Sequence, residues 1–225
     1  MAIRDESSST TELLRDSRYH RAALTSDPQT VDLAAPVKKV AALLKSRRDE
    51  HDEAEDLRAE HLAILIRTDL ELDEKLRVVE LETLAAVGKN RQDPRYQATF
   101  SRGLSYVIAL RGTDEALEVR AIHKALAGHL PELAKRHGKA LEALAANTEV
   151  AEAKWRQSVI EAGAAAVAEQ LARGELVLQL RKNEGALLSI YPGDKRRVRS
   201  FFRTVRRGGG GGGDEPDTVV EPKVG

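Results

Sequence analysis

The chain has 225 residues, of which 41% are hydrophobic, 4% aromatic and 32% charged, and its 36 basic residues balance its 36 acidic ones. The absence of cysteine excludes disulfides, zinc–thiolate sites and a thiol nucleophile, and no stretch approaches the roughly 18 uncharged apolar residues of a membrane-spanning helix. Because aromatic residues are few, alanine and leucine must supply most of the core. This composition, with its many charges, is typical of long helices and coiled coils.

The N-terminal segment, residues 1–34, is polar, and we expect it to be mostly disordered apart from a short helix over residues 11–24. It has no apolar signal core. Together with the absence of cysteine, this favours a cytoplasmic location. Ser26, Asp27 and Pro28 indicate a turn before the next element.

Residues 37–88 contain no proline and no interior glycine, which predicts one helix of roughly 80 Å. Apolar residues recur at helical spacing near both of its ends, whereas residues 45–61 are almost entirely charged. Charges three and four residues apart can support such a helix, but a helix that is polar on most faces cannot be deeply buried. We therefore expect the middle of this helix to lie in a thin, two-stranded part of the bundle.

The next helix is predicted to start at Asp93-Pro94 and to end at Gly112. A second break is expected at residues 128–131, and weaker breaks at 137–138 and 147–148. Another long helix should then reach Leu188. Its small-residue segment, residues 163–168, predicts a close helix–helix seam, because small side chains let two backbones approach.

Two topologies fit these breaks. Turns near residues 89–93 and 146–148 give three antiparallel helices of similar length, whereas turns at Gly112 and 128–131 give two long helices flanking a short helical hairpin. We favour the second, because it explains the charged middle of the first helix. The predicted fold class is all-α: an elongated antiparallel helical bundle with coiled-coil character over residues 35–191, in which two very long helices flank one or two shorter ones.

No catalytic, metal or cofactor site is expected. None of the six histidines has an acidic residue three positions before it, as a di-iron bundle would require, and His51 with Glu55 is interpreted as a solvated pair. The six glycines, residues 208–213, are followed by acidic residues and are interpreted as a linker rather than a phosphate loop. They open a disordered tail that we expect over residues 208–225.

Residues 192–207 predict a short basic amphipathic helix capped by Asp194. Its apolar stripe either contacts a partner or folds back onto the bundle while the arginines merely solvate it. The candidate partner-binding residues are Lys195, Arg196, Arg197, Val198, Arg199, Phe201, Phe202, Arg203, Val205, Arg206 and Arg207.

These features predict a non-catalytic structural or interaction protein: a scaffold, adaptor or assembly subunit whose partner is a protein or a second copy. The alternative is a protein that binds nucleic acid or an anionic membrane surface through residues 194–207. Salt dependence separates the two, since phosphate binding weakens steeply with salt.

Overall fold

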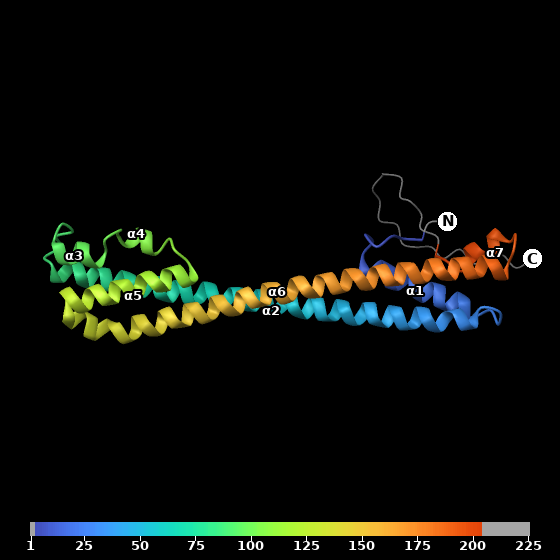
Figure 1. The fold of residues 1–225 in the computed structure, drawn as a ribbon, viewed down its shortest axis with the longest axis horizontal. Coiled ribbons are helices and arrows are strands. Elements are labelled where there is room, and N and C mark those ends of the chain that lie inside the picture. The colour runs from blue at the N-terminus through green and yellow to red at the C-terminus, as the bar shows by residue number, and fades with distance from the viewer. Residues whose placement is uncertain (1–2, 204–225) are drawn as a thin grey trace, which may run out of the picture. The chain divides into compact units, whose positions relative to one another are not determined.

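The computed structural model describes residues 3–203, and this part of the chain contains helices but no β-strand. The two very long helices pack antiparallel, with the shorter helices α3, α4 and α5 between them in the chain (Figure 1), which confirms the predicted all-α fold class. The elements are α1 (Thr10–Thr25), a 3₁₀ turn η1 (Val31–Leu33), α2 (Ala34–Ala86), α3 (Pro94–Thr99), α4 (Leu104–Val107), α5 (Gly112–His129), α6 (Pro131–Ile190) and α7 (Lys195–Ser200).

The chain divides into two compact units. Unit 2 is residues 42–173, whereas unit 1 combines both ends of the chain and is described over residues 3–41 and 174–203. The predicted linker and tail, residues 208–225, lie outside the described residues. No helix within residues 3–203 has both the length and the apolar character needed to cross a bilayer.

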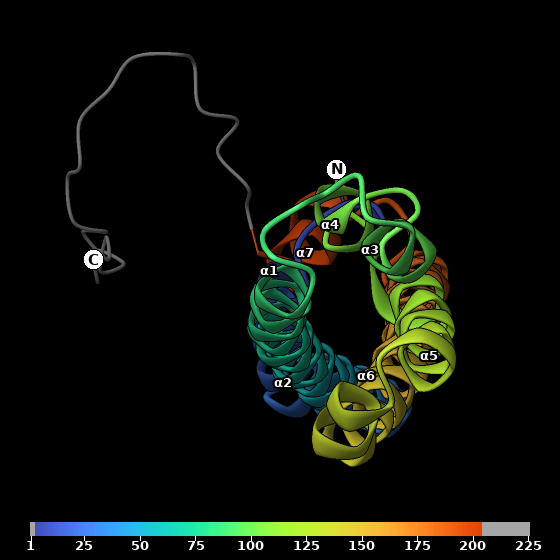
Figure 2. The same ribbon diagram turned by 90° about the vertical axis from the view of Figure 1, so that its left-hand side faces the viewer.

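The core of unit 2 is shared by α2, α5 and α6 with the α3–α4 segment, and Figure 2 shows these elements end-on around a common centre. Tyr96 and Phe100 are the aromatic contributions, whereas leucine, valine and alanine fill the rest. Completely buried residues of this core are Leu72, Leu76 and Val79 of α2, Ala116, Val119 and Leu126 of α5, and Leu141 and Ala145 of α6.

The charged middle of α2 is helical without interruption, as predicted. Ion pairs three or four residues apart support it: Arg47–Glu50, Arg48–Asp52 and Arg58–Glu55. Towards α6, His51 Nδ1 lies 2.6 Å from a carboxylate oxygen of Glu169, a contact between residues far apart in sequence. Further along, Arg136 of α6 pairs with Glu82 of α2 at 2.6 Å. Because the α6 partner number falls as the α2 number rises, the two helices run in opposite directions.

The break predicted at residues 128–131 is present, since α5 ends at His129 and α6 starts at Pro131. The weaker breaks at 137–138 and 147–148 are wrong, because α6 is continuous from Pro131 to Ile190. Gly138 is explained by packing instead. A Cβ atom at this position would lie 2.2 Å from the His123 ring of α5, so glycine permits the close approach of α5 and α6.

The helix predicted from Pro94 to about residue 111 forms only as the short helices α3 and α4. Gly112 does adopt a left-handed conformation, with φ of +57°, but it begins α5 instead of ending a helix. A Cβ atom there would meet the Glu152 carboxylate at 2.4 Å. Thr113 accounts for that carboxylate's position, since its backbone N–H donates to Glu152 at 2.6 Å.

The close seam predicted at residues 163–168 is absent at its first residue. Gly163 is exposed, and a Cβ atom there would have nothing within 4 Å. The buried residues of this part of α6 are Ala162, Glu169 and Ala172. Ala164 and Val167 are exposed as well, whereas Ala165, Ala166 and Ala168 are half-buried.

Unit 1 is formed by α1, η1, the start of α2, the end of α6 and α7. The short helix expected over residues 11–24 is α1, and Ser9 caps it by accepting a hydrogen bond from the Glu12 backbone N–H at 3.3 Å. The turn that follows is held by Thr30, whose hydroxyl donates to the Leu24 carbonyl at 2.9 Å. Completely buried apolar residues of unit 1 are Leu13, Leu24, Val37, Leu176 and Leu187.

Candidate contact surface on α7

Of the amphipathic helix predicted over residues 192–207, the structure forms α7 over Lys195–Ser200, and Asp194 caps it by accepting a hydrogen bond from the Arg197 backbone N–H at 2.9 Å. Its apolar side is turned inward: Val198, Phe201 and Phe202 are all buried in unit 1. The sequence left open whether this apolar stripe contacts a partner or folds back onto the bundle. These three residues fold back onto the helices of unit 1.

His20 of α1 holds this aromatic side in place. Its ring stacks on Phe202 with 4.3 Å between the ring centroids. Its Nδ1–H donates to the Phe201 carbonyl at 2.8 Å, and its Nε2 accepts from the Asn183 side-chain amide at 3.1 Å. These two bonds require the neutral imidazole with its proton on Nδ1. Burial also lowers the pKa of His20 below the ordinary value of 6.5.

Two of the predicted basic residues are engaged inside unit 1. Arg197 donates to Asp27 at 2.8 Å and stacks over the Tyr191 ring at 4.0 Å, while the Tyr191 hydroxyl donates to the same carboxylate. The hydrogen bond from Tyr191 has the largest effect on the pKa of Asp27, followed by that from Arg197, and both lower it. Arg203 lies 3.5 Å from the Asp16 carboxylate.

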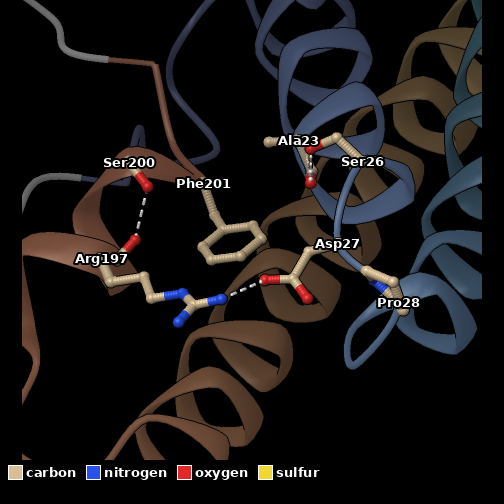
Figure 3. A pocket seen from close by; sticks show the side chains of 7 residues that line it. All are labelled: Ala23, Ser26, Asp27, Pro28, Arg197, Ser200 and Phe201. Atoms are coloured by element: carbon tan, nitrogen blue, oxygen red, sulfur yellow. Dashed lines mark hydrogen bonds and ion pairs between the residues drawn. The ribbon is translucent and has the colours of Figure 1, made fainter.

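A hollow of about 430 Å³ lies between the end of α1 and α7 (Figure 3). Ser26, Asp27 and Pro28 line it from one side, and Arg197 with Phe201 from the other. The charged groups drawn there are paired with each other. The hollow therefore presents little net charge to a ligand.

The remaining cations of α7 face solvent. Lys195, Arg196 and Arg199 are exposed, and none of them has an ion pair with another residue of the described part. This separates them from Arg197 and Arg203. Val205, Arg206 and Arg207, the other candidates predicted from the sequence, lie outside the described residues.

A group of buried carboxyls in unit 2 was missed by the sequence interpretation. Glu115 of α5 is completely buried, and Asp69 of α2 is nearly so. Burial and then the neighbouring carboxylate of Asp73 raise the pKa of Glu115 to about 8, so its carboxyl keeps a proton at neutral pH. Burial also raises the pKa of Asp69, against the opposing charge of Arg111.

A signal for these acids was present in the sequence. Asp69 falls between Leu65, Leu72 and Leu76 in the four–three–four spacing of a buried helical stripe. Glu115 continues the equivalent stripe of α5. Within residues 3–203, however, no group of three or more His, Asp or Glu side chains is arranged to hold a metal ion.

Comparison with protein-family models, with curated proteins and with solved structures gives no match to this chain.

Proposed function

We propose that the protein is a non-catalytic interaction protein, a scaffold, adaptor or assembly subunit, in which the long helices form the frame and the outer side of α7 is a contact surface. The observation that carries this proposal is the division of α7 into a buried apolar side and an exposed side whose Lys195, Arg196 and Arg199 lack acidic partners in the described part of the chain. The partner that fits this surface is an acidic segment of another protein.

The burial of the aromatic side decides how such a contact works. A partner groove that received Phe201 and Phe202 would first have to remove them from the core of unit 1. This removal is costly, because truncating one buried phenylalanine lowers the free energy of unfolding by about 3–5 kcal/mol. Binding through the exposed cations leaves this core intact. The contact is therefore electrostatic, and Val198 and the aromatics position α7 instead of touching the partner.

The second candidate is binding to nucleic acid or to an anionic membrane surface through the same cations. Two of the three exposed cations are arginines, and the guanidinium fork suits phosphate as well as carboxylate. Phosphate-rich partners give a steep loss of affinity with salt, because binding releases condensed counterions. The class of partner is thus open to direct test.

The test compares defined anionic probes on the full chain: a poly-glutamate peptide, a DNA oligonucleotide, and vesicles with and without an anionic lipid. The variant Lys195→Glu/Arg196→Glu/Arg199→Glu should weaken binding of the preferred probe by at least about tenfold, since three attractions become repulsions. The control Lys38→Glu/Lys39→Glu/Arg181→Glu makes the same change in net charge at three other exposed cations of unit 1 and should bind as the unchanged chain does.

Three results would decide against parts of this proposal. Equal losses in the two variants would show a general charge effect with no role for α7. Preference for the oligonucleotide or the anionic vesicles over the peptide would replace the protein partner by the second candidate. Failure of the unchanged chain to bind any of the probes at low salt would remove the contact function of α7.

A further inference from the structure

The outer side of α6 carries an apolar stripe with the spacing of a coiled-coil seam. Its positions in unit 2 follow one another at intervals of four, three, four, three and four residues, the heptad repeat of interacting helices. They are Ala153, Gln157, Ile160, Ala164, Val167 and Leu171. All six are exposed, and Ile160, Val167 and Leu171 keep 65%, 57% and 67% of their surface.

This stripe is separate from the side of α6 that packs against α2. The inward residues of the same stretch are Ser158, Ala162 and Glu169, which lie on the opposite side of the helix from the stripe. The inward side of this stretch is therefore covered within the described residues, whereas the apolar stripe is not. The small residues beside the stripe, Gly163 among them, leave room for another backbone to approach.

We infer that the stripe is the interface with a second copy of this chain, in which α6 pairs with α6 of the other copy, parallel and in register. The charges beside the stripe support this occupant. In a parallel pair, the residue before a seam position faces the residue five places later in the partner helix. Arg156, which precedes Gln157, then meets the copy's Glu161. Glu149 precedes Val150, an exposed residue that extends the seam spacing by one position, and it meets the copy's Lys154, so both flanking contacts join opposite charges.

Two of these groups have no ion-pair partner within residues 3–203. Lys154 and Glu161 are exposed and form no ion pair there, and Glu161 accepts a hydrogen bond from the Gln157 side-chain amide at 2.8 Å. Arg156 and Glu149 bond Glu152 and Arg120, respectively. The seam also contains one polar position, Gln157. In the parallel, in-register pair the two Gln157 amides face each other, and a single polar seam residue of this kind fixes register and strand number in coiled coils.

The first measurement is the mass of the full chain in solution at tens of micromolar. We expect about twice the single-chain mass of 24.7 kDa. Val167→Glu/Leu171→Glu should return the mass to that of one chain, with unchanged helicity, because both side chains are exposed in the single chain. The matched control is Leu117→Glu/Leu81→Glu, whose side chains are also 57% and 67% exposed in unit 2 but lie off the stripe. The control should keep the doubled mass.

The second measurement fixes the orientation, and the absence of native cysteine makes it simple. Under mild oxidation, Ala153→Cys and Ala164→Cys should each give a covalent dimer, because a parallel, in-register pair places every seam position beside its own copy. The control Ala127→Cys, at an exposed alanine of α5, should not. An antiparallel pair brings only one point of the seam onto its own copy, so at most one of the two positions, about 16 Å apart along the helix, would cross-link.

The inference is overturned by a single-chain mass for the unchanged protein, by a doubled mass that survives Val167→Glu/Leu171→Glu, or by cross-linking at fewer than both seam positions. It rests on α6 alone, so it stands or falls independently of the contact proposed for α7.

Discussion

In unit 1, the polar groups that reach the interior find neutral partners: His20 bonds the Phe201 carbonyl on one ring nitrogen and the Asn183 amide on the other. In unit 2, the buried carboxyl of Glu115 lies instead near other acids, Asp73 and Asp69. The surroundings of His20 disfavour its protonation, so its pKa is lowered. The surroundings of Glu115 disfavour loss of its proton, so its pKa is raised.

The two units should therefore respond to pH in opposite directions. The pKa of His20 is lower in the folded chain than the ordinary 6.5, so unit 1 is stabilised above pH 6.5 and loses that stability as the pH falls through the folded value. The pKa of Glu115 is raised from 4.5 to about 8. Its contribution is complete below pH 4.5 and is lost as the pH rises towards 8 and beyond.

The largest expected effect comes from the aromatic side of α7. Phe201→Ser/Phe202→Ser should lower the free energy of unfolding of unit 1 by several kcal/mol, since truncating a buried phenylalanine costs about 3–5 kcal/mol. Urea unfolding followed by circular dichroism measures it. Val31→Ser, at a half-exposed residue of the same unit, should change little. If the double substitution lowered the free energy of unfolding as little as Val31→Ser does, Phe201 and Phe202 would not be core residues and would instead be candidates for contact with a partner.

Next in size is the removal of the buried acid of unit 2. Glu115→Gln keeps the shape of the protonated carboxyl but cannot ionise, so it should stabilise the chain at pH 9 by about 2–4 kcal/mol while changing little at pH 5. Thermal melts at the two pH values test this. Glu118→Gln, a partly exposed neighbour on α5, is the control. The same gain at both pH values would contradict a pH-linked cost at Glu115.

A smaller effect is expected at the centre of unit 1. Asn183→Ala leaves His20 Nε2 and the Leu33 carbonyl without their donor, which should cost about 1–3 kcal/mol. Lys182→Ala, at the exposed neighbouring position, gives the baseline. Chemical unfolding at pH 7.5 compares the two variants, and equal stabilities would mean that the amide is replaceable by water.

The smallest effect should come from the ion pair beside the hollow. Asp27→Asn weakens the contacts with Arg197 and Tyr191, and a slight fall in the melting temperature at pH 7 is expected because half of Arg197 is in water. The pKa of Asp27 is lowered, so its contribution is present above the ordinary 3.8 and is lost on acidification. A difference between Asp27→Asn and the unchanged chain that does not shrink as the pH falls below 3.8 would contradict this assignment.

The long helices could be predicted from local information. A stretch without proline or interior glycine has no alternative to a helix at this composition, and α2 accordingly runs from Ala34 to Ala86. The roles of the glycines were harder to predict from sequence, because glycine occurs both in turns and where two helices approach closely. Gly138 was assigned to a break, yet it stays helical beside His123 of α5, which only the folded chain brings near.

The site could be predicted in part for a similar reason. Helical spacing correctly grouped Val198, Phe201 and Phe202 on one buried side of the segment formed by α7 and the turn after it, because this grouping depends only on neighbouring residues. The residues that cover this side cannot be predicted from neighbouring residues, because His20 lies 181 residues before Phe201. The buried acids were missed because most of the acids assessed lie in the charged run of α2, whereas Asp69 and Glu115 interrupt apolar stripes.

Hydrogen exchange of the backbone amides at pH 5.5 and pH 8.5, corrected for the intrinsic exchange rates, tests the contrast between the units most directly. We predict that amides of α1, which carries His20, are better protected at pH 8.5, and that amides of α5, which carries Glu115, are better protected at pH 5.5. Protection that changes in the same direction in both helices would contradict the account.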